Sequence, residues 1–416
     1  MKVVFLSGVE TAGGGNVAAS RLANGLTEQG VSVTRLYNQR VTSPFGEPRQ
    51  WNSRFVGLPR GLDILNNGLR RFSAPAAARL GGLYANVALA NTLSQIEFDI
   101  LHVHVIHNSF WNLSSVERLP IDIPTVWTFH DCWGFSPEAQ LFRNLDGQEV
   151  RLRPDGADRA AALGARQKYF RSRRFCRLAS NSTQVAQMAT AALGMPVEPL
   201  GYGLDLDKFR PLEKCACRRA LGIGDDAFIM LLVADNLADP VKGFAVLEKA
   251  LRESEGLRGA ILLTVGGEEC GEFNIGAVRV QQLGRLYNPA LMALVYSAAD
   301  VLVMPSLAEA LGQVAMESVA CGVPVVGSNV QGIPDVARPG QTGFLFSVGD
   351  PEALRRLLER LRANPAEAAA LAQSCRAFAV ENWDFRHNAK RYLALYEDLL
   401  RDKERGREIG ASSGAE

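Results

Sequence analysis

The sequence predicts an α/β protein made of two doubly wound, parallel-sheet domains. Short runs rich in Val, Ile and Leu alternate with amphipathic stretches of helical period along most of the 416 residues. Continuous apolar runs of this kind are typical of parallel strands that helices cover on both faces. The chain is too long for one compact core, and the alternating series starts afresh in its second half. Two domains that face each other would place ligands at the carboxyl ends of their strands.

The first series indicates an N-terminal domain over residues 1–205. Its expected strands are Val3–Leu6, Ser32–Leu36, Ile100–Val105, Thr125–Phe129 and Arg177–Ser180, and its first helix is Asn16–Gln29. The segment Pro199–Pro211 has several glycines and prolines and no apolar periodicity, so we place the break between the domains there.

The second series indicates a C-terminal domain over residues 206–384. Its expected strands are Ala227–Ala234, Ala260–Val265, Val278–Leu283, Val301–Pro305 and Pro324–Gly327. Its expected helices are Phe244–Glu253, Pro289–Ala298, Gln313–Ala320 and Pro351–Arg362. A last amphipathic helix, residues 385–403, is expected to return and complete the first domain, and residues 404–416 are expected to form a flexible tail.

Composition narrows the functional classes. The 45 basic and 44 acidic side chains give a net charge of +1, which argues against a dedicated nucleic-acid-binding protein. No apolar run approaches the roughly 18 residues of a membrane span, and the N-terminus lacks a signal-peptide core. The seven cysteines include no Cys-x-x-Cys pair, which indicates neither a zinc site nor a disulfide framework. We therefore expect a cytoplasmic protein.

The most informative segment runs from Asp300 to Glu317. A buried strand ends at Pro305-Ser306, a loop presents Glu309, and a helix begins near Gly312 with Glu317 inside it. The amino terminus of a helix carries unpaired N–H groups and partial positive charge, which suits a diphosphate. The two carboxylates could then bind a sugar and a ribose on either side. Taken singly, Glu309 could be a helix-capping acid and Glu317 an exposed helix residue.

At this point the sequence resembles the family 4 retaining glycosyltransferases of the GT-B fold. The Glu309-x7-Glu317 spacing carries the resemblance, together with several motifs in the family's order. These are Gly13-Gly14-Gly15, Tyr202–Pro211, Lys242-Gly243, Ala320-Cys-Gly-Val-Pro324, Gln331–Asp335 and Gln341–Leu345. The segment Trp127–Trp133 resembles a subgroup that includes the colanic-acid and other exopolysaccharide transferases.

The resemblance implies sugar transfer from a nucleoside-diphosphate sugar to an acceptor hydroxyl with retained anomeric configuration. It implies that the C-terminal domain binds the donor and the N-terminal domain a glycan or lipid-linked acceptor. The implied catalytic residues are His130, Lys242 and Glu309. The implied donor-binding residues are Gly14, Gly15, Lys242, Glu309, Ala310, Leu311, Gly312 and Glu317, and the implied acceptor-binding residues are Gly13, His104 and Asp131. No cofactor is implied beyond the nucleotide sugar as co-substrate.

The glycine run admits other interpretations. Glycines 13–15 follow a strand and precede a helix, so the backbone there can approach a ligand closely. An NAD-binding fingerprint would need Gly-x-Gly-x-x-Gly and an acid after the second strand. Here the run continues Asn16-Val-Ala, and Arg35 stands near the end of the second strand, which disfavours hydride transfer. A plain flexible turn remains the structural alternative.

Lys242 is expected to neutralise the leaving diphosphate. Most members of the family place an Arg several residues before this Lys, whereas this chain has Asp235-Asn236. Arg285 is a candidate for the second phosphate-binding cation. An exposed, solvated lysine is the alternative interpretation.

The histidines suggest a second cluster. His130, with Asp131 beside it, follows a strand of the first domain and is expected to contact the donor sugar or orient the acceptor hydroxyl. His102 is interpreted as a core residue, and His104 or His107 as an acceptor-site residue. No carboxylate or thiolate cluster accompanies them, so no metal site is expected.

The basic run 166–177 suggests a possible contact with an anionic inner-membrane surface, with Tyr169 and Phe170 inserted among the lipids. A solvated helix face is the alternative for this run. RNA binding is disfavoured because no RNA-binding module surrounds it. Two rival functions remain open. One is a GT-B phosphorylase or sugar-phosphate synthase, and the other is a non-catalytic nucleotide-sugar-binding protein.

Overall fold

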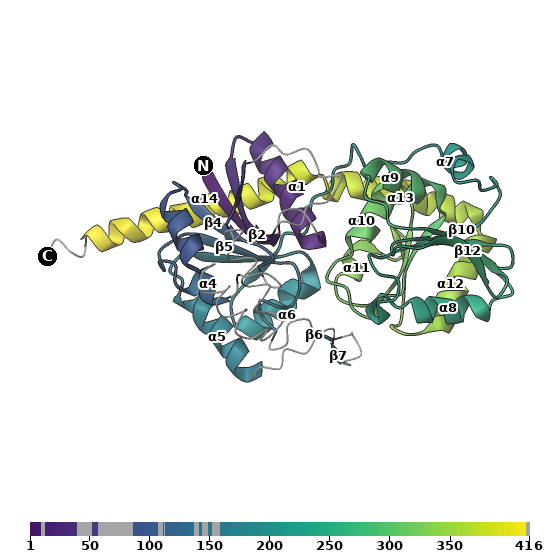
Figure 1. The fold of residues 1–416 in the computed structure, drawn as a ribbon, viewed down its shortest axis with the longest axis horizontal. Coiled ribbons are helices and arrows are strands. Elements are labelled where there is room, and N and C mark those ends of the chain that lie inside the picture. Colours follow the sequence, from purple (N-terminus) through teal and green to yellow (C-terminus); the bar gives the residue numbers. More distant parts are fainter. Residues whose placement is uncertain are drawn as a thin grey trace, which may run out of the picture.

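The computed structural model describes residues 1–9, 13–39, 52–56, 86–106, 111, 113–136, 141–143, 149–151 and 159–412. These residues form two lobes side by side, each built around a sheet of seven strands (Figure 1). Helices cover both faces of each sheet, as the alternating pattern predicts. The α/β class and the GT-B arrangement expected from the sequence are confirmed.

The N-lobe contains a parallel sheet of strand order β3-β2-β1-β4-β5-β8-β9. Its strands are β1 (Lys2–Val9), β2 (Ser32–Gln39), β3 (Asn52–Phe55), β4 (Ile100–Val103), β5 (Thr125–Phe129), β8 (Cys176–Ser180) and β9 (Val197–Pro199). Every residue of β4 and β5 is buried, as is typical of parallel strands that helices cover on both faces. Strands β6 (Leu141–Arg143) and β7 (Glu149–Arg151) form a separate antiparallel pair.

The C-lobe sheet has the order β12-β13-β11-β10-β14-β15-β16. Its strands are β10 (Ile229–Val233), β11 (Ile261–Val265), β12 (Cys270–Ile275), β13 (Val278–Leu283), β14 (Val301–Met304), β15 (Val325–Ser328) and β16 (Gly343–Phe346). The expectation of purely parallel sheets is wrong for β12, which pairs antiparallel with β13. All residues of β12 except Ile275 are exposed, so no apolar run marks this edge strand in the sequence.

The helices alternate with the strands. In the N-lobe they are α1 (Gly14–Glu28), α4 (Leu113–Glu117), α5 (Arg159–Ser172) and α6 (Thr183–Leu193). In the C-lobe they are α7 (Lys214–Ala220), the 3-10 turn η1 (Pro240–Lys242), α8 (Phe244–Arg252), α9 (Pro289–Ala298), α10 (Gln313–Ala320), α11 (Ile333–Val336), α12 (Pro351–Ala363) and α13 (Pro365–Asn382). The last helix is α14 (Phe385–Ser412).

Helix α14 crosses from the C-lobe to the N-lobe and packs along α1 (Figure 1). Its Tyr396 hydroxyl lies 2.6 Å from Nδ1 of His102, and its Tyr392 hydroxyl lies 3.1 Å from Oγ1 of Thr128. His102 is thus a buried core residue, as the sequence suggests. The helix continues to Ser412, beyond residue 403, so the tail expected from residue 404 is helical for most of its length.

Both sheets reverse their strand order at one point, between β1 and β4 in the N-lobe and between β10 and β14 in the C-lobe. Ligands of doubly wound sheets bind outside the carboxyl ends of the strands at such a point. Gly13–Gly15 follow β1, and His104 follows β4. Lys242 follows β10, and Glu309 follows β14. Four predicted site segments therefore stand at the two switch points.

The contact of α14 with α1 can be tested at Gly25. A Cβ added there would lie 2.8 Å from both the Phe385 carbonyl oxygen and the Ala389 Cβ. We expect overpacking in Gly25→Ala to lower the free energy of unfolding by about 1–3 kcal/mol. This loss offsets the gain of about 1 kcal/mol from the higher helix propensity of alanine. Urea denaturation measures the change.

The control is Gly164→Ala in α5, where an added Cβ would have no neighbour within 4 Å. It keeps the gain in helix propensity without the clash and should be neutral or stabilising. If Gly25→Ala is as stabilising as Gly164→Ala, α14 does not pack on α1 as described.

Candidate active site between the two lobes

Lys242 and Glu309 form the charged centre of the site. Glu309 lies in the loop after β14 and Lys242 at the end of η1, and the Glu309 Oε2 is 2.9 Å from the Lys242 Nζ. The Lys242 side chain is 34% exposed and that of Glu309 is 18% exposed, so both keep partial access to solvent. Attraction to Glu309 raises the pKa of Lys242, against the opposing effect of burial. The lysine is therefore a cation at neutral pH, available to a diphosphate.

The first turn of α10 lies against the glycine loop of the N-lobe. Gly312 precedes the helix in a left-handed conformation, with φ of 86°, and no side chain caps the first turn. The Gln313 side-chain amide donates a hydrogen bond to the Gly14 carbonyl. A Cβ at Gly15 would lie 2.6 Å from Val105 and 3.0 Å from His130, so only glycine fits there. The helix end thus faces the glycine loop from the opposite lobe.

Glu317 lies one turn further along α10 and has two protein partners. Its Oε1 accepts a hydrogen bond from the Arg21 guanidinium of α1 at 2.9 Å, and its Oε2 accepts one from the Tyr296 hydroxyl at 3.1 Å. The Arg21 and Glu317 side chains are only 5% and 13% exposed. A carboxylate has about four lone-pair positions, so Glu317 retains capacity for further hydroxyl donors.

Arg21 also connects the lobes through Gln313, whose Oε1 lies 3.0 Å from the guanidinium. A second contact joins the lobes at α6, where the Thr183 backbone N–H donates to the Asp335 carboxylate at 2.6 Å. Ala308 and Ala310, from the Glu309 loop, pack against the apolar core of the N-lobe. These contacts hold the Glu309 loop and the start of α10 against the N-lobe.

His130 is fixed at both ring nitrogens. The Nδ1 of His130 lies 2.7 Å from the Tyr202 hydroxyl, which also accepts a hydrogen bond from the Asn181 amide at 3.2 Å. The Nε2 of His130 lies 3.0 Å from Nδ1 of His104. Burial is the main cause that lowers the pKa of His104 well below 6.5, and the nearby His102, His130 and Arg35 lower it further. His104 is therefore neutral.

This network changes the interpretation of the histidines. The sequence suggests that His130 orients an acceptor hydroxyl, but both of its ring nitrogens bind protein groups in this arrangement. His104 is buried and lies next to His130, and the acceptor contact suggested for it stays a prediction. Asp131 accepts the backbone N–H of Trp133 at 2.9 Å and so orders the turn after β5. His107 lies outside the described residues.

Two other sequence-based suggestions meet different environments. Arg285 pairs with Asp235 at 2.7 Å and Glu268 at 3.6 Å, so its charge is engaged by acids. Within the basic run 166–177, Tyr169 and Phe170 are buried core residues, which overturns their suggested insertion among lipids. Arg173 donates to the backbone carbonyls of Pro120 and Val116. Much of this run therefore serves the N-lobe core.

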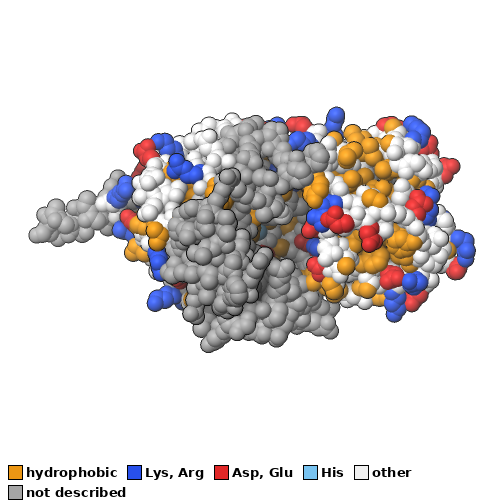
Figure 2. Space-filling model, viewed as in Figure 1, with side chains coloured by type: hydrophobic (Ala, Val, Ile, Leu, Met, Phe, Trp, Pro, Cys, Tyr) orange, Lys and Arg blue, Asp and Glu red, His pale blue; other side chains and the backbone are white. Residues whose placement is uncertain are grey.

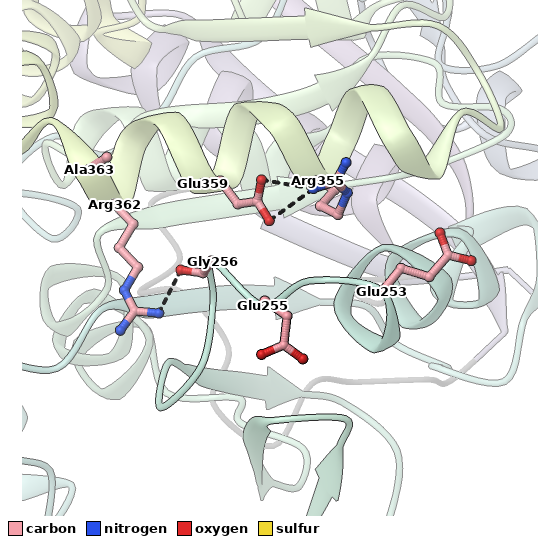
Figure 3. Close-up of a pocket in the computed structure, with 7 residues that line it drawn as sticks. All are labelled: Glu253, Glu255, Gly256, Arg355, Glu359, Arg362 and Ala363. Carbon is pink, nitrogen blue, oxygen red and sulfur yellow. Dashed lines mark hydrogen bonds and ion pairs between the residues drawn. The ribbon is translucent and has the colours of Figure 1, made fainter.

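A second concave surface lies between the end of α8 and α12 (Figure 3). Arg355 pairs with Glu359 in this surface, and Arg362 donates to the Gly256 carbonyl. None of the predicted site residues lines it. Acidic and basic side chains also alternate over the visible face of the C-lobe (Figure 2), as is typical of a solvated surface.

The described residues include no cluster of three His, Cys, Asp or Glu side chains placed to hold a metal ion. Among the helices of the described ranges, none is long and apolar enough to cross a bilayer.

The chain matches two protein families in sequence order. Residues 12–208 match the family described as Glycosyltransferase Family 4, and residues 228–364 match Glycosyl transferases group 1. Together these segments carry the glycine loop, Lys242, Glu309 and Glu317. Both matched families are glycosyltransferase families, and the chain is a glycosyltransferase.

Full-length relatives agree with this assignment. The glycosyltransferase is 26% identical to the D-inositol 3-phosphate glycosyltransferase of Actinosynnema mirum, over 95% of each chain. It is 27% identical to the protein of that name from Mycobacterium avium, over 95% of this chain and 91% of the relative.

Solved structures share the fold. Sucrose-phosphate synthase from Thermosynechococcus elongatus superposes with a TM-score of 0.69 at 21% identity, over 96% of this chain and 99% of the other. Anabaena HepE in complex with UDP-glucose superposes with a TM-score of 0.67 at 17% identity, over 96% of this chain and all of the other.

The sequence predicts no site role for five residues that complete the site of this glycosyltransferase: Arg21, Tyr202, Tyr296, Gln313 and Gln331. Tyr202, Gln313 and Gln331 lie in segments that the sequence singles out, whereas Arg21 and Tyr296 do not. The only signal for Arg21 is a cation within an otherwise apolar helix face. Its partner is almost three hundred residues away, so spacing within the sequence does not reveal the pair.

The ion pair between Arg21 and Glu317 can be tested by removing the cation. Arg21→Met leaves the Glu317 carboxylate buried without its countercharge, which should cost about 3 kcal/mol of unfolding free energy. Urea denaturation measures the loss, and adding Glu317→Gln should restore part of it.

Arg258→Met is the matched control, because Arg258 and its partner Glu255 are 69% and 83% exposed. We expect little change there. A loss at Arg21 no larger than that at Arg258 would show that the interlobe pair does not stabilise the protein.

Proposed function

We propose that this glycosyltransferase transfers a sugar from a nucleoside-diphosphate sugar to an acceptor hydroxyl with retention of configuration. The observation that carries the proposal is the meeting of Lys242, Glu309 and the first turn of α10 at the C-lobe switch point, opposite the glycine loop. The complex of HepE with UDP-glucose and the same GT-B fold support a donor of this class.

In the proposed complex the diphosphate lies at the amino terminus of α10, beside Lys242. Backbone N–H groups of that turn and of the glycine loop share its negative charge with the ammonium. Ala310, Leu311 and Gly312 supply the backbone that leads into the helix. Glu309 binds hydroxyls of the transferred sugar, and Glu317 binds the ribose diol with its remaining lone pairs.

The proposed reaction breaks the bond between sugar C1 and the diphosphate oxygen. The acceptor oxygen forms its bond to C1 on the same face, and its proton passes to the departing phosphate oxygen. Lys242 and the α10 terminus stabilise the charge that develops on the diphosphate. Glu309 and Glu317 each bind a separate cation, an arrangement that does not favour a pair of carboxylates for double displacement.

His130 contributes to this proposal through the position of its ring. Tyr202 and His104 hold the nitrogens, and the ring lies against Gly15 of the glycine loop. We place the donor sugar beside this ring, with Gly13 and Asp131 toward the acceptor. Any exchange of a ring-nitrogen bond for a substrate hydroxyl would need Tyr202 or His104 to release it.

The proposed acceptor is a growing glycan or a lipid-linked sugar, as in exopolysaccharide or lipopolysaccharide assembly. The subgroup motif around His130 supports this acceptor class. The full-length relatives are named for D-inositol 3-phosphate, so that compound belongs in the acceptor panel. Because Tyr169 and Phe170 are buried, any membrane-surface contact through residues 166–177 would rest on the basic side chains alone.

A donor screen followed by a transfer assay tests the proposal. Calorimetry with UDP-, GDP-, ADP- and dTDP-sugars should give one preferred donor, and NMR of the product should show the anomeric configuration of that donor. Lys242→Ala and Glu309→Ala should each lower kcat by about 10²–10³-fold while the protein stays folded. Lys249→Ala, an exposed lysine in α8, is the matched control and should keep full activity.

Other outcomes favour the rival functions. Turnover only with inorganic phosphate or a phosphosugar as acceptor would indicate a phosphorylase or a sugar-phosphate synthase. Tight donor binding without turnover on any acceptor would indicate a binding protein. Full activity of Lys242→Ala would contradict the proposed diphosphate site.

A further inference from the structure

Gln331 and Gly332 hold the backbone of Glu309 through two hydrogen bonds. The Glu309 N–H donates to the side-chain Oε1 of Gln331 at 3.0 Å, and the Glu309 carbonyl accepts the N–H of Gly332 at 3.1 Å. Gln331 and Gly332 lie between β15 and α11. Because Glu309 is in a loop, these two bonds replace the backbone constraints that a helix or strand would provide.

Gln331 adopts an unfavourable backbone conformation to make this contact. Its φ is +34°, and it is the one non-glycine residue with positive φ among those that the structure describes. Glutamine is not one of the residues that readily adopt the left-handed region, such as Gly, Asn or Asp. Gln331 is 1% exposed, so solvent does not explain the conformation. Such outliers persist where the surroundings enforce them and concentrate at functional sites.

The packing beside Gln331 enforces the conformation. A Cβ at Gly332 would lie 2.1 Å from the Ala310 carbonyl oxygen and 2.5 Å from the Leu311 Cα. The turn formed by Gln331 and Gly332 therefore lies in direct contact with the loop from Glu309 to Leu311. The Glu309 Oε2 in that loop lies 2.9 Å from the Lys242 Nζ. A change in the turn would move the carboxylate relative to Lys242.

We propose that Gln331 is a positioning residue that fixes the Glu309 carboxylate for the transferred sugar. The inference rests on the proposed role of Glu309 in binding that sugar. The proposal predicts that variants lose interactions with one part of the donor, the sugar, and keep those with the other part, the nucleotide diphosphate. Loss of the Gln331 contact should weaken interactions with the sugar, while the nucleotide diphosphate, held by Lys242, the α10 terminus and Glu317, should bind as before.

Two substitutions separate positioning from general stability. Gln331→Gly removes the Oε1 acceptor and the backbone strain together. Gln331→Asn tolerates the same backbone conformation, but its amide is one methylene too short to reach the Glu309 N–H.

The experiment compares binding of four pairs by calorimetry: UDP with UDP-glucose, GDP with GDP-mannose, ADP with ADP-glucose, and dTDP with dTDP-glucose. The pair that the wild-type protein binds best is used for all variants, with kcat and KM measured alongside. We expect Gln331→Gly and Gln331→Asn to bind the nucleotide diphosphate as the wild type does, and to lose about 10–100-fold in kcat/KM. Thermal unfolding should show that both variants remain folded, with some loss of stability because each leaves the Glu309 N–H without its acceptor.

The outcomes separate failure of the positioning role from failure of the proposed function. Wild-type kcat/KM in both Gln331→Gly and Gln331→Asn would overturn the positioning role. So would equal losses in affinity for the nucleotide and the nucleotide sugar, since a merely structural residue would affect both. A wild-type protein that binds none of the four pairs would overturn the proposed function itself, and the inference with it.

Discussion

The contact between the first turn of α10 and the glycine loop of α1 sets the geometry on which the site depends. Gln313 bonds to the Gly14 carbonyl, and Arg21 reaches from α1 to both Gln313 and Glu317. Because α10 begins at the C-lobe switch point and α1 at that of the N-lobe, this contact brings the two switch points together. A ligand bound at one lobe therefore meets groups from the other.

Charge compensation explains how acids and bases can gather there. The Lys242–Glu309 and Arg21–Glu317 pairs each neutralise a carboxylate that is largely removed from solvent. A diphosphate would add negative charge beside Lys242, where attraction outweighs desolvation and keeps the ammonium protonated. The more buried pair is suited to holding the lobes, and the more open pair to exchanging partners with a substrate.

Local sequence patterns predict much of the fold. Several elements have the bounds expected from the sequence, because their apolar period and end residues define them locally. These are helices Pro289–Ala298 and Gln313–Ala320 and strands Thr125–Phe129 and Val278–Leu283. The exposed edge strand β12 was missed because it buries almost no apolar surface. The α14 end was placed too early, since apolar packing fades before the helix does.

The candidate site is predictable only in part. Lys242, Glu309 and the glycine loop stand in local motifs, so sequence finds them. Tyr202 and Gln331 also begin recognisable motifs, but the groups that they and Arg21 hold lie elsewhere along the chain, so only folding reveals their roles.

The central claim concerns where the diphosphate binds. The most direct measurement is a crystal structure with the preferred nucleotide sugar. The account predicts phosphate oxygens within about 3 Å of backbone N–H groups in the first turn of α10 and of the Lys242 ammonium. A nucleotide bound elsewhere, such as the surface between α8 and α12, would contradict it.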